Sequence, residues 1–174
     1  MDDTDIDAAT LSEIDLAFGH IEKPEHFTDV THCEECAEHD ELLRTRNRET
    51  LSASDVENPG WDPFCFSSAN GLAYYFPTLA RLALSKTDAN PCGWYADQLL
   101  FHLYSGFTEN AFFQLCSVVQ RQAVAHFIAH MIETRPAHID RNGSTDEFFR
   151  CHSLWSTAPD SAQENAPSTD VEPN

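Results

Sequence analysis

Residues 108–134 read TENAFFQLCSVVQRQAVAHFIAHMIET and carry the strongest helical pattern in the chain. A first apolar set recurs at helical spacing (Ala111, Phe112, Leu115), and a second set follows it (Val119, Ala123, Val124, Phe127, Ile128, Met131). The two sets are out of phase and Ser117 lies between them, so the stretch predicts either one long helix or two packed helices. Thr108 is a candidate cap, and Pro136 is expected to end the stretch.

Working outward, the N-terminal half predicts two further helices. Leu11, Ile14, Leu16 and Phe18 indicate a short amphipathic helix that begins at Thr10 and stops at Gly19. The spacing of Thr31 and Glu34 is that of a capping box, and it predicts a helix over residues 32–48. Acidic residues at its start and arginines at its end suit the helix dipole.

The middle of the chain predicts two more helices and a docked C-terminal element. Ser67 or Ser68 can cap a run with apolar residues at helical spacing (Leu72, Tyr75, Phe76, Leu79, Leu82, Ala83), which leaves Tyr74 as an exposed candidate. Pro77 is expected to kink or restart this helix, because proline lacks the amide donor. Residues 94–104 predict a further helix, and residues 144–156 a short docked element.

The fold class is therefore mainly α, with no convincing alternating strand pattern. The hydrophobic fraction of 41% and 19 aromatic residues suffice for a real core. We expect one compact domain of five or six helices over residues 10–156. Residues 1–9 are expected to be a disordered acidic N-terminus, and residues 157–174, which hold three prolines and neither leucine nor aromatic residues, a disordered acidic tail.

The net charge of the chain favours some kinds of binding partner and disfavours others. The chain has 29 acidic and 10 basic side chains, for a formal charge of −19, and residues 1–41 hold fourteen of the acids and one base. Like charge opposes direct contact with nucleic acid or an anionic membrane, whereas a basic protein is attracted. Four glutamates of the 32–48 helix are the candidate partner-binding residues: Glu34, Glu35, Glu38 and Glu41. The alternative is a solubilising acidic surface.

Neither a membrane span nor a secretory leader is indicated. No run approaches the roughly 18 consecutive apolar residues that a membrane-spanning helix needs. The start, MDDTD, lacks the positive charge and apolar run of a signal peptide. We expect a cytoplasmic protein whose six cysteines are thiols or metal ligands rather than disulfides.

Residues 32–39 read HCEECAEH and contain four histidine and cysteine side chains that can act as metal ligands. Cys33 and Cys36 have the spacing of half a zinc site, and His32 and His39 add two candidate ligands. On one straight helix His32 and His39 would lie about 10 Å apart, so a single ion cannot take all four residues. Further ligands are then needed from elsewhere, and the candidates are Cys65, Cys92 and the Cys151–His152 pair.

The Cys33/Cys36 pair allows two interpretations other than zinc binding, and a second histidine pair needs one of its own. Cys33 and Cys36 can simply be small, partly buried residues of a helix face. A thioredoxin-like use is opposed by the neighbouring glutamates, which disfavour a thiolate, and by the lack of a βαβ pattern. His126 and His130 share a helix face but lack the glutamate base of a zinc protease, so ordinary hydrogen bonds are favoured there.

Three motifs in this order resemble a family of small, functionally uncharacterised bacterial proteins. They are the Cys33-x-x-Cys36 pair on an acidic helix, Tyr74-Tyr75-Phe76-Pro77-x-Leu79, and Gln120-x-x-Ala123-Val124-x-x-Phe127. The resemblance covers residues 30–134. It implies a bacterial or phage source and a helical fold, and it carries over no activity or catalytic residue.

Three functional hypotheses follow from these observations. The first is a non-enzymatic binding protein, of the inhibitor or immunity type, whose acidic N-terminal region contacts a basic partner protein. The second is a zinc-stabilised module anchored by the Cys33/Cys36 pair. The third is a Cys/His or metal-dependent enzyme, for which the sequence offers no catalytic template.

Overall fold

The structure is a computed structural model that describes residues 3–85 and 93–157, with side chains described from Ile6 onward. Within these residues the chain forms nine α-helices and two short 3₁₀ helices, without a strand. The elements in chain order are α1 (Asp3–Phe18), α2 (Glu34–Thr45), α3 (Ala53–Val56), η1 (Pro59–Trp61), α4 (Ala69–Leu84), α5 (Tyr95–Tyr104), η2 (Phe107–Glu109), α6 (Ala111–Leu115), α7 (Val118–Thr134), α8 (Pro136–Asn142) and α9 (Thr145–Trp155). The predicted mainly α fold is confirmed.

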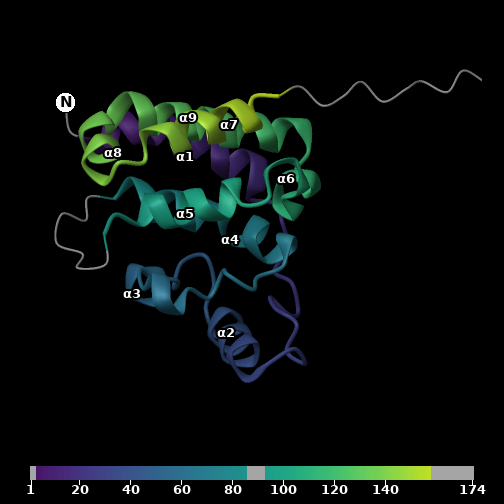
Figure 1. Ribbon diagram of the computed structural model, residues 1–174. Helices are drawn as coiled ribbons and strands as arrows, with labels where there is room; N and C mark the ends of the chain where they lie inside the picture. The colour runs from purple at the N-terminus through teal and green to yellow at the C-terminus, as the bar shows by residue number, and fades with distance from the viewer. Residues whose placement is uncertain (1–2, 86–92, 158–174) are drawn as a thin grey trace, which may run out of the picture.

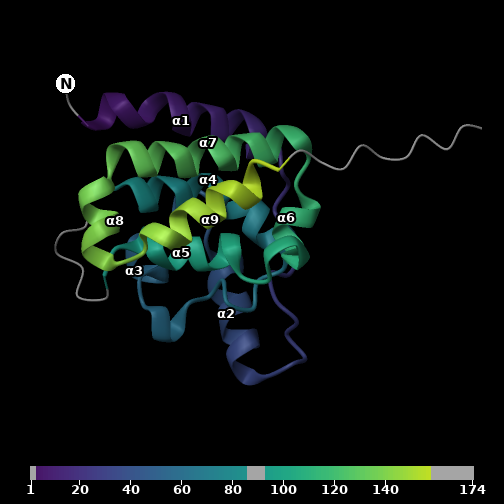
Figure 2. The ribbon, with the colours of Figure 1, turned by 45° about the horizontal axis from the view of Figure 1, so that its top comes forward.

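The longer helices form a layered body (Figure 1). Helix α1 packs on α7 and α4, α7 packs on α9, and α5 packs between α4 and α9. Figure 2 shows α1, α7 and α9 following one another across the top of this body. The described residues form nine α-helices rather than the expected five or six. Six of them have ten residues or more, and the short α3, α6 and α8 account for the difference.

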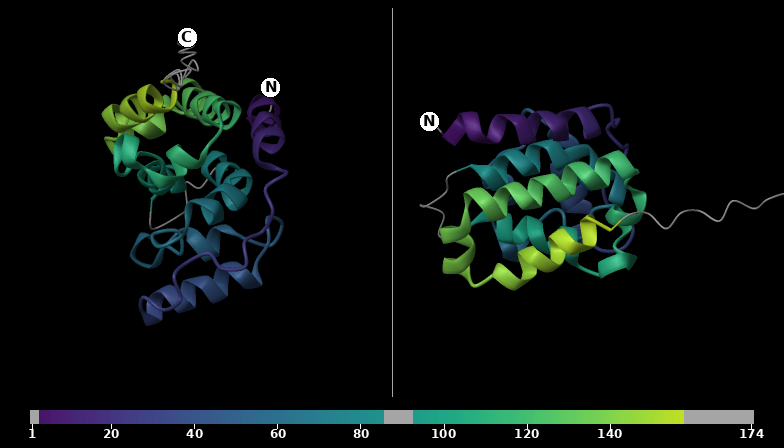
Figure 3. Two further views of the ribbon diagram at one scale, coloured as in Figure 1. Left: turned by 90° about the vertical axis from the view of Figure 1, so that its right-hand side faces the viewer. Right: turned by 90° about the horizontal axis from the view of Figure 1, so that it is seen from above.

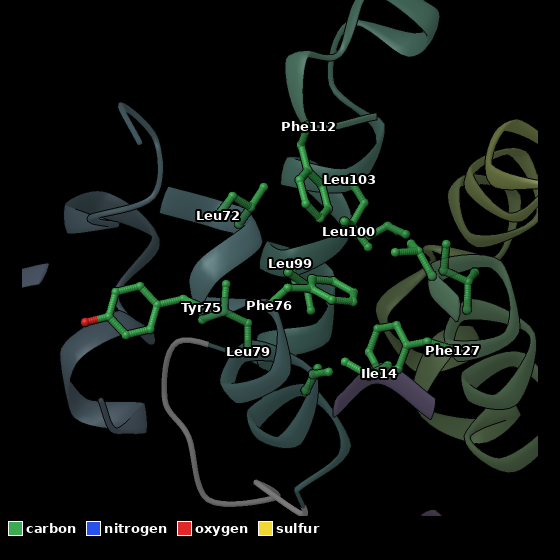
Figure 4. Close-up of a cluster of buried hydrophobic side chains, with 14 of the residues drawn as sticks. Ile14, Leu72, Tyr75, Phe76, Leu79, Leu99, Leu100, Leu103, Phe112 and Phe127 are labelled. Atoms are coloured by element: carbon green, nitrogen blue, oxygen red, sulfur yellow. The ribbon is translucent and has the colours of Figure 1, made fainter. Parts of the chain in front are cut away.

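The core is built around α4, which supplies a continuous run of buried side chains from Gly71 to Ala80. Phe76 lies at its centre, with its ring centroid 4.9 Å from that of Phe18 and 5.5 Å from that of Phe112 (Figure 4). Helix α4 continues through Pro77, so the alternative in which the helix restarts at this proline is wrong. Tyr74, expected to be exposed, is 8% exposed beneath the Arg48 guanidinium.

The 108–134 stretch divides into two helices, one of the two predicted arrangements. Ser117 begins α7 with a reciprocal capping box, in which its hydroxyl accepts from the Gln120 N–H and the Gln120 side chain accepts from the Ser117 N–H. Asn110, and not Thr108, caps α6 through a hydrogen bond from the Phe113 N–H. The Arg121 side chain donates to the carbonyls of Phe113 and Cys116, so it stabilises the bend between the two helices.

The N-terminal prediction needs correction. Helix α1 begins at Asp3, so the expectation that residues 1–9 are disordered is wrong for residues 3–9. The reason is a polar contact between distant residues: Asp7 is 7% exposed and accepts hydrogen bonds from His130 and Arg135, both at 2.7 Å. Except for Thr157, the predicted tail at 157–174 lies outside the described residues.

Three acids of α1 are paired with basic side chains of other helices. Besides the Asp7 pairs, Glu13 on α1 pairs with His126 on α7, and Asp15 on α1 pairs with Arg81 on α4. The negative charge of residues 1–41 is therefore not one surface, because α1 turns part of it toward α4 and α7.

Helix α2 lies at the end of the molecule opposite α7 and α9 (Figure 1, and Figure 3, left). It is tied to the body by polar contacts: Asp40 accepts from the Phe27 N–H at 2.6 Å and the Thr28 N–H at 3.3 Å, and it pairs with His26 at 2.8 Å. The hydroxyl of Thr28 in turn donates to the Cys36 carbonyl at 2.6 Å. These contacts clamp the middle of α2 onto the segment before it.

No helix in the described part of the chain is both long enough and apolar enough to span a membrane.

Candidate metal centre

The first turn of α2 brings three ligand-capable side chains together. The ligand atoms of His32, Cys33 and Cys36 all lie within 4.8 Å of one another. The two sulfur atoms are 3.3 Å apart, and the His32 Nδ1 is 3.3 Å from the Cys36 Sγ. In a tetrahedral zinc site, bonds of about 2.3 Å to sulfur and 2.0 Å to nitrogen place ligand atoms about 3.5–3.8 Å apart. A small adjustment of the side chains therefore admits the ion.

The local backbone explains the cluster. The helix begins at Glu34 rather than His32, and its N-cap is Cys33 rather than Thr31. The predicted capping box is thus wrong: Thr31 bonds to Asp29 instead, through both its N–H and its hydroxyl. His32 precedes the helix, and its Nδ1 lies 3.3 Å from the Cys36 Sγ, a contact that the i, i+4 spacing of the two residues favours.

The two thiols have different surroundings. The Cys36 N–H donates to the Cys33 Sγ at 3.3 Å, and this hydrogen bond, followed by the Cys36 thiol, lowers the pKa of Cys33. Burial, followed by the hydrogen bond with Cys33, raises the pKa of Cys36 to about 11. Cys33 is exposed and Cys36 is 2% exposed, so Cys33 is the more accessible ligand.

His39 does not join the group. Its ring is 1% exposed and lies 4.7 Å from the Trp61 ring and 6.1 Å from the Phe66 ring. Neither ring nitrogen has a hydrogen bond among the described residues, although Nε2 is 3.4 Å from the Glu35 carboxylate. The predicted fourth member of the motif is therefore part of an aromatic contact beside the cluster.

The outside ligands proposed from sequence do not reach the cluster either. Cys65 is exposed but is not within the group, and Cys151 is fully buried on α9. His152 bonds to Ser156 on the same helix, and Cys92 lies outside the described residues. Of the described residues, only His32, Cys33 and Cys36 form such a group.

The acidic candidates lie on the same helix. Glu34, Glu38 and Glu41 are exposed and follow at i, i+4 and i+7, which places them along one face of α2. Glu35 is half-buried beside His39. Two aromatic side chains nearby, Trp61 and Phe66, are each 42% exposed. The Phe66 ring is 6.3 Å from that of His32, whereas Trp61 contacts His39.

The other histidine pairs have ordinary partners. His126 and His130 bond to carboxylates of α1, as favoured from sequence. A buried pair that the sequence did not single out joins Asp62 to His102 at 2.6 Å, and it borders a cavity of about 440 Å³. Burial, then nearby Asp62 and Glu35, raises the pKa of Cys65 beside this pair, opposite to what a nucleophile needs.

The chain matches no protein-family model, no curated protein and no solved structure, so the resemblance to small bacterial proteins stays a prediction.

Proposed function

We propose that the protein binds zinc through His32, Cys33 and Cys36. The observation that carries this function is the gathering of one imidazole nitrogen and two thiol sulfurs within 4.8 Å at the start of α2. Two thiolates and an imidazole form a ligand set that zinc prefers in proteins. Zinc binding also stabilises this end of α2, because metal affinity adds directly to folding stability.

Metal analysis tests this function. The untagged chain is purified, loaded with zinc, desalted and measured by mass spectrometry. We expect about one zinc per chain, and a loss of it in Cys36→Ser and His32→Ala. The matched controls are Cys65→Ser and His20→Ala, because both residues are exposed and lie outside the cluster. A metal-free wild type, or equal metal loss in the controls, contradicts the function.

A second function, docking on a basic protein, is supported by the acidic face of α2. Glu34, Glu38 and Glu41 are exposed together, and none of their side chains has a hydrogen bond or ion pair with another described residue. Exposed charges of one sign steer an oppositely charged protein and act mainly on its association rate. An inhibitor or immunity-type protein that covers a cationic site would use such a face.

The charge variant Glu34→Gln, Glu38→Gln, Glu41→Gln tests this second function. Glu35 is left unchanged because it lies beside His39. The matched control, Glu109→Gln, Glu133→Gln, Glu147→Gln, removes three exposed charges elsewhere. With a basic polypeptide such as polylysine, we expect slower association only for the α2 variant, and a decrease with salt for both. Equal rates for the two variants contradict docking at α2.

A further inference from the structure

The candidate metal centre supplies three ligands from the described chain, whereas structural zinc sites have four. No further histidine, cysteine or carboxylate among the described residues brings a ligand atom into the group. A three-ligand zinc site keeps one position for a molecule that comes from outside.

The outside ligand has access from solvent. Cys36 approaches the cluster from the protein interior, whereas His32 and Cys33 are exposed. Phe66 presents an exposed ring 6.3 Å from that of His32, and aromatic side chains are enriched in the centres of protein interfaces. The accessible side of the centre is therefore bordered by the Phe66 ring, whereas the acidic face of Glu34, Glu38 and Glu41 lies on the side of α2 opposite Cys36.

The charge around the centre determines which kind of ligand can take the fourth position on the metal. Zinc with two thiolates is already neutral, and the carboxylates of Asp29 and Glu35 lie close enough to Cys36 to act on its charge. An added thiolate would give the centre a net negative charge among these acids, which Coulomb repulsion disfavours. A neutral imidazole adds no charge and is a common zinc ligand.

Granted the metal site proposed above, we propose that its fourth position is taken by a histidine on a basic segment of a partner protein. The histidine completes the coordination, the basic residues pair with Asp29 and Glu35, whose carboxylates lie near Cys36, and the Phe66 ring contacts the segment. These two carboxylates and the metal centre are then parts of one docking surface.

Cobalt makes this testable, because the absorption bands of tetrahedral cobalt respond to each ligand. The full-length chain is loaded with Co²⁺ and titrated with three synthetic peptides: a lysine-rich peptide with one central histidine, the same peptide with alanine there, and a glutamate-rich peptide with histidine. We expect the basic histidine peptide to bind at least about tenfold more tightly than the alanine peptide, with a change in the cobalt bands. Chelation should remove this difference.

Several results would overturn the inference while leaving the metal site intact. One is cobalt binding with equal affinity for the histidine and alanine peptides and unchanged bands. Another is a change in the bands of the peptide-free protein on Cys92→Ser, which would place the fourth ligand within the chain. A third is equal binding of the acidic and basic histidine peptides. Failure of the wild type to bind cobalt would instead remove the metal site itself.

Discussion

The hydroxyl of Tyr75, on α4, donates a hydrogen bond of 2.7 Å to the carbonyl oxygen of Leu43, in the last turn of α2. The last carbonyls of a helix have no partner within it, so they need donors from outside. Tyr75 supplies one donor, and the Lys23 ammonium donates to the carbonyl oxygens of Arg44 and Arg46. The C-terminal end of α2 is thus fixed by the body, and its N-terminal end carries the candidate metal centre.

Replacing Tyr75 by phenylalanine should destabilise the protein by about 1–3 kcal/mol, because the Leu43 carbonyl then stays buried without its partner. Thermal or urea unfolding measures the change. Tyr95→Phe is the matched control: its hydroxyl is buried and has no hydrogen bond among the described residues, so its removal should cost little or stabilise. Equal losses for both variants would show that the Tyr75 hydrogen bond contributes nothing specific.

Asp40 is expected to make the free energy of unfolding depend on pH in the acidic range. Although burial acts to raise its pKa, hydrogen bonds from His26, Phe27 and Thr28 lower it below the ordinary value. A carboxyl with a lowered pKa in the folded state contributes stability above its unfolded pKa of about 4, and this contribution is lost as the pH falls through the folded value. Asp40→Asn should therefore cost about 1–3 kcal/mol at pH 7 and progressively less below pH 4.

The control for this prediction is Glu49→Gln, which removes one exposed acid close by in the chain. It should leave stability nearly unchanged at both pH values. The measurement is urea unfolding at pH 7 and at several points below pH 4. A constant difference between Asp40→Asn and the wild type over this range would contradict the linkage to Asp40.

Arg48 joins two segments distant in sequence. Its guanidinium donates to the carbonyls of Phe18, Gly19 and Ile21 just after α1, and to that of Tyr74 on α4. It also lies 4.4 Å from the centre of the Tyr74 ring. Lysine cannot reproduce this planar, multiple donation, so Arg48→Lys should destabilise by about 3 kcal/mol. Arg150→Lys, at an exposed position of α9, should have no measurable effect on urea unfolding.

The sequence was sufficient for features that depend on local spacing. The helices around residues 69–84, 95–104 and 118–134 were predicted because apolar residues recur within each one. The start of α1 was missed because its stabilising contacts, from His130 and Arg135 to Asp7, come from residues more than a hundred positions away. No local pattern contains such information.

The candidate metal centre was predicted in part for the same reason. The spacing of Cys33 and Cys36 indicated half a site, and both His32 and His39 lie within about one helical turn of Cys36, so local spacing alone does not choose between them. In the structure the His32 Nδ1 lies 3.3 Å from the Cys36 Sγ. His39 is drawn instead into contact with Trp61 and Phe66, which lie beyond α2 in the sequence.

Thiol reactivity should distinguish the two cysteines of the centre. The lowered pKa and exposure of Cys33 favour alkylation, whereas the pKa of Cys36, about 11, and its burial oppose it. In metal-free protein at pH 7, iodoacetamide should modify Cys33 at least about 100-fold faster than Cys36, as followed by peptide mass spectrometry. Added zinc should slow the alkylation of Cys33 but not that of the exposed Cys65. Unchanged Cys33 reactivity with zinc would contradict its role as a ligand.

Metal removal should loosen one end of α2 selectively. With the ion bound, His32, Cys33 and Cys36 are held together, so opening the first turn of α2 requires metal release as well as broken hydrogen bonds. With a chelator, amide hydrogen exchange should accelerate over residues 31–37. It should stay unchanged in the last turn of α2, which the Tyr75 and Lys23 contacts hold, and in α7, whose buried face is remote from the centre. Cys36→Ser should show the accelerated exchange with or without the chelator. If exchange accelerates evenly over α2 and α7, the metal acts on the global stability of the protein. If exchange accelerates nowhere, the metal does not stabilise α2.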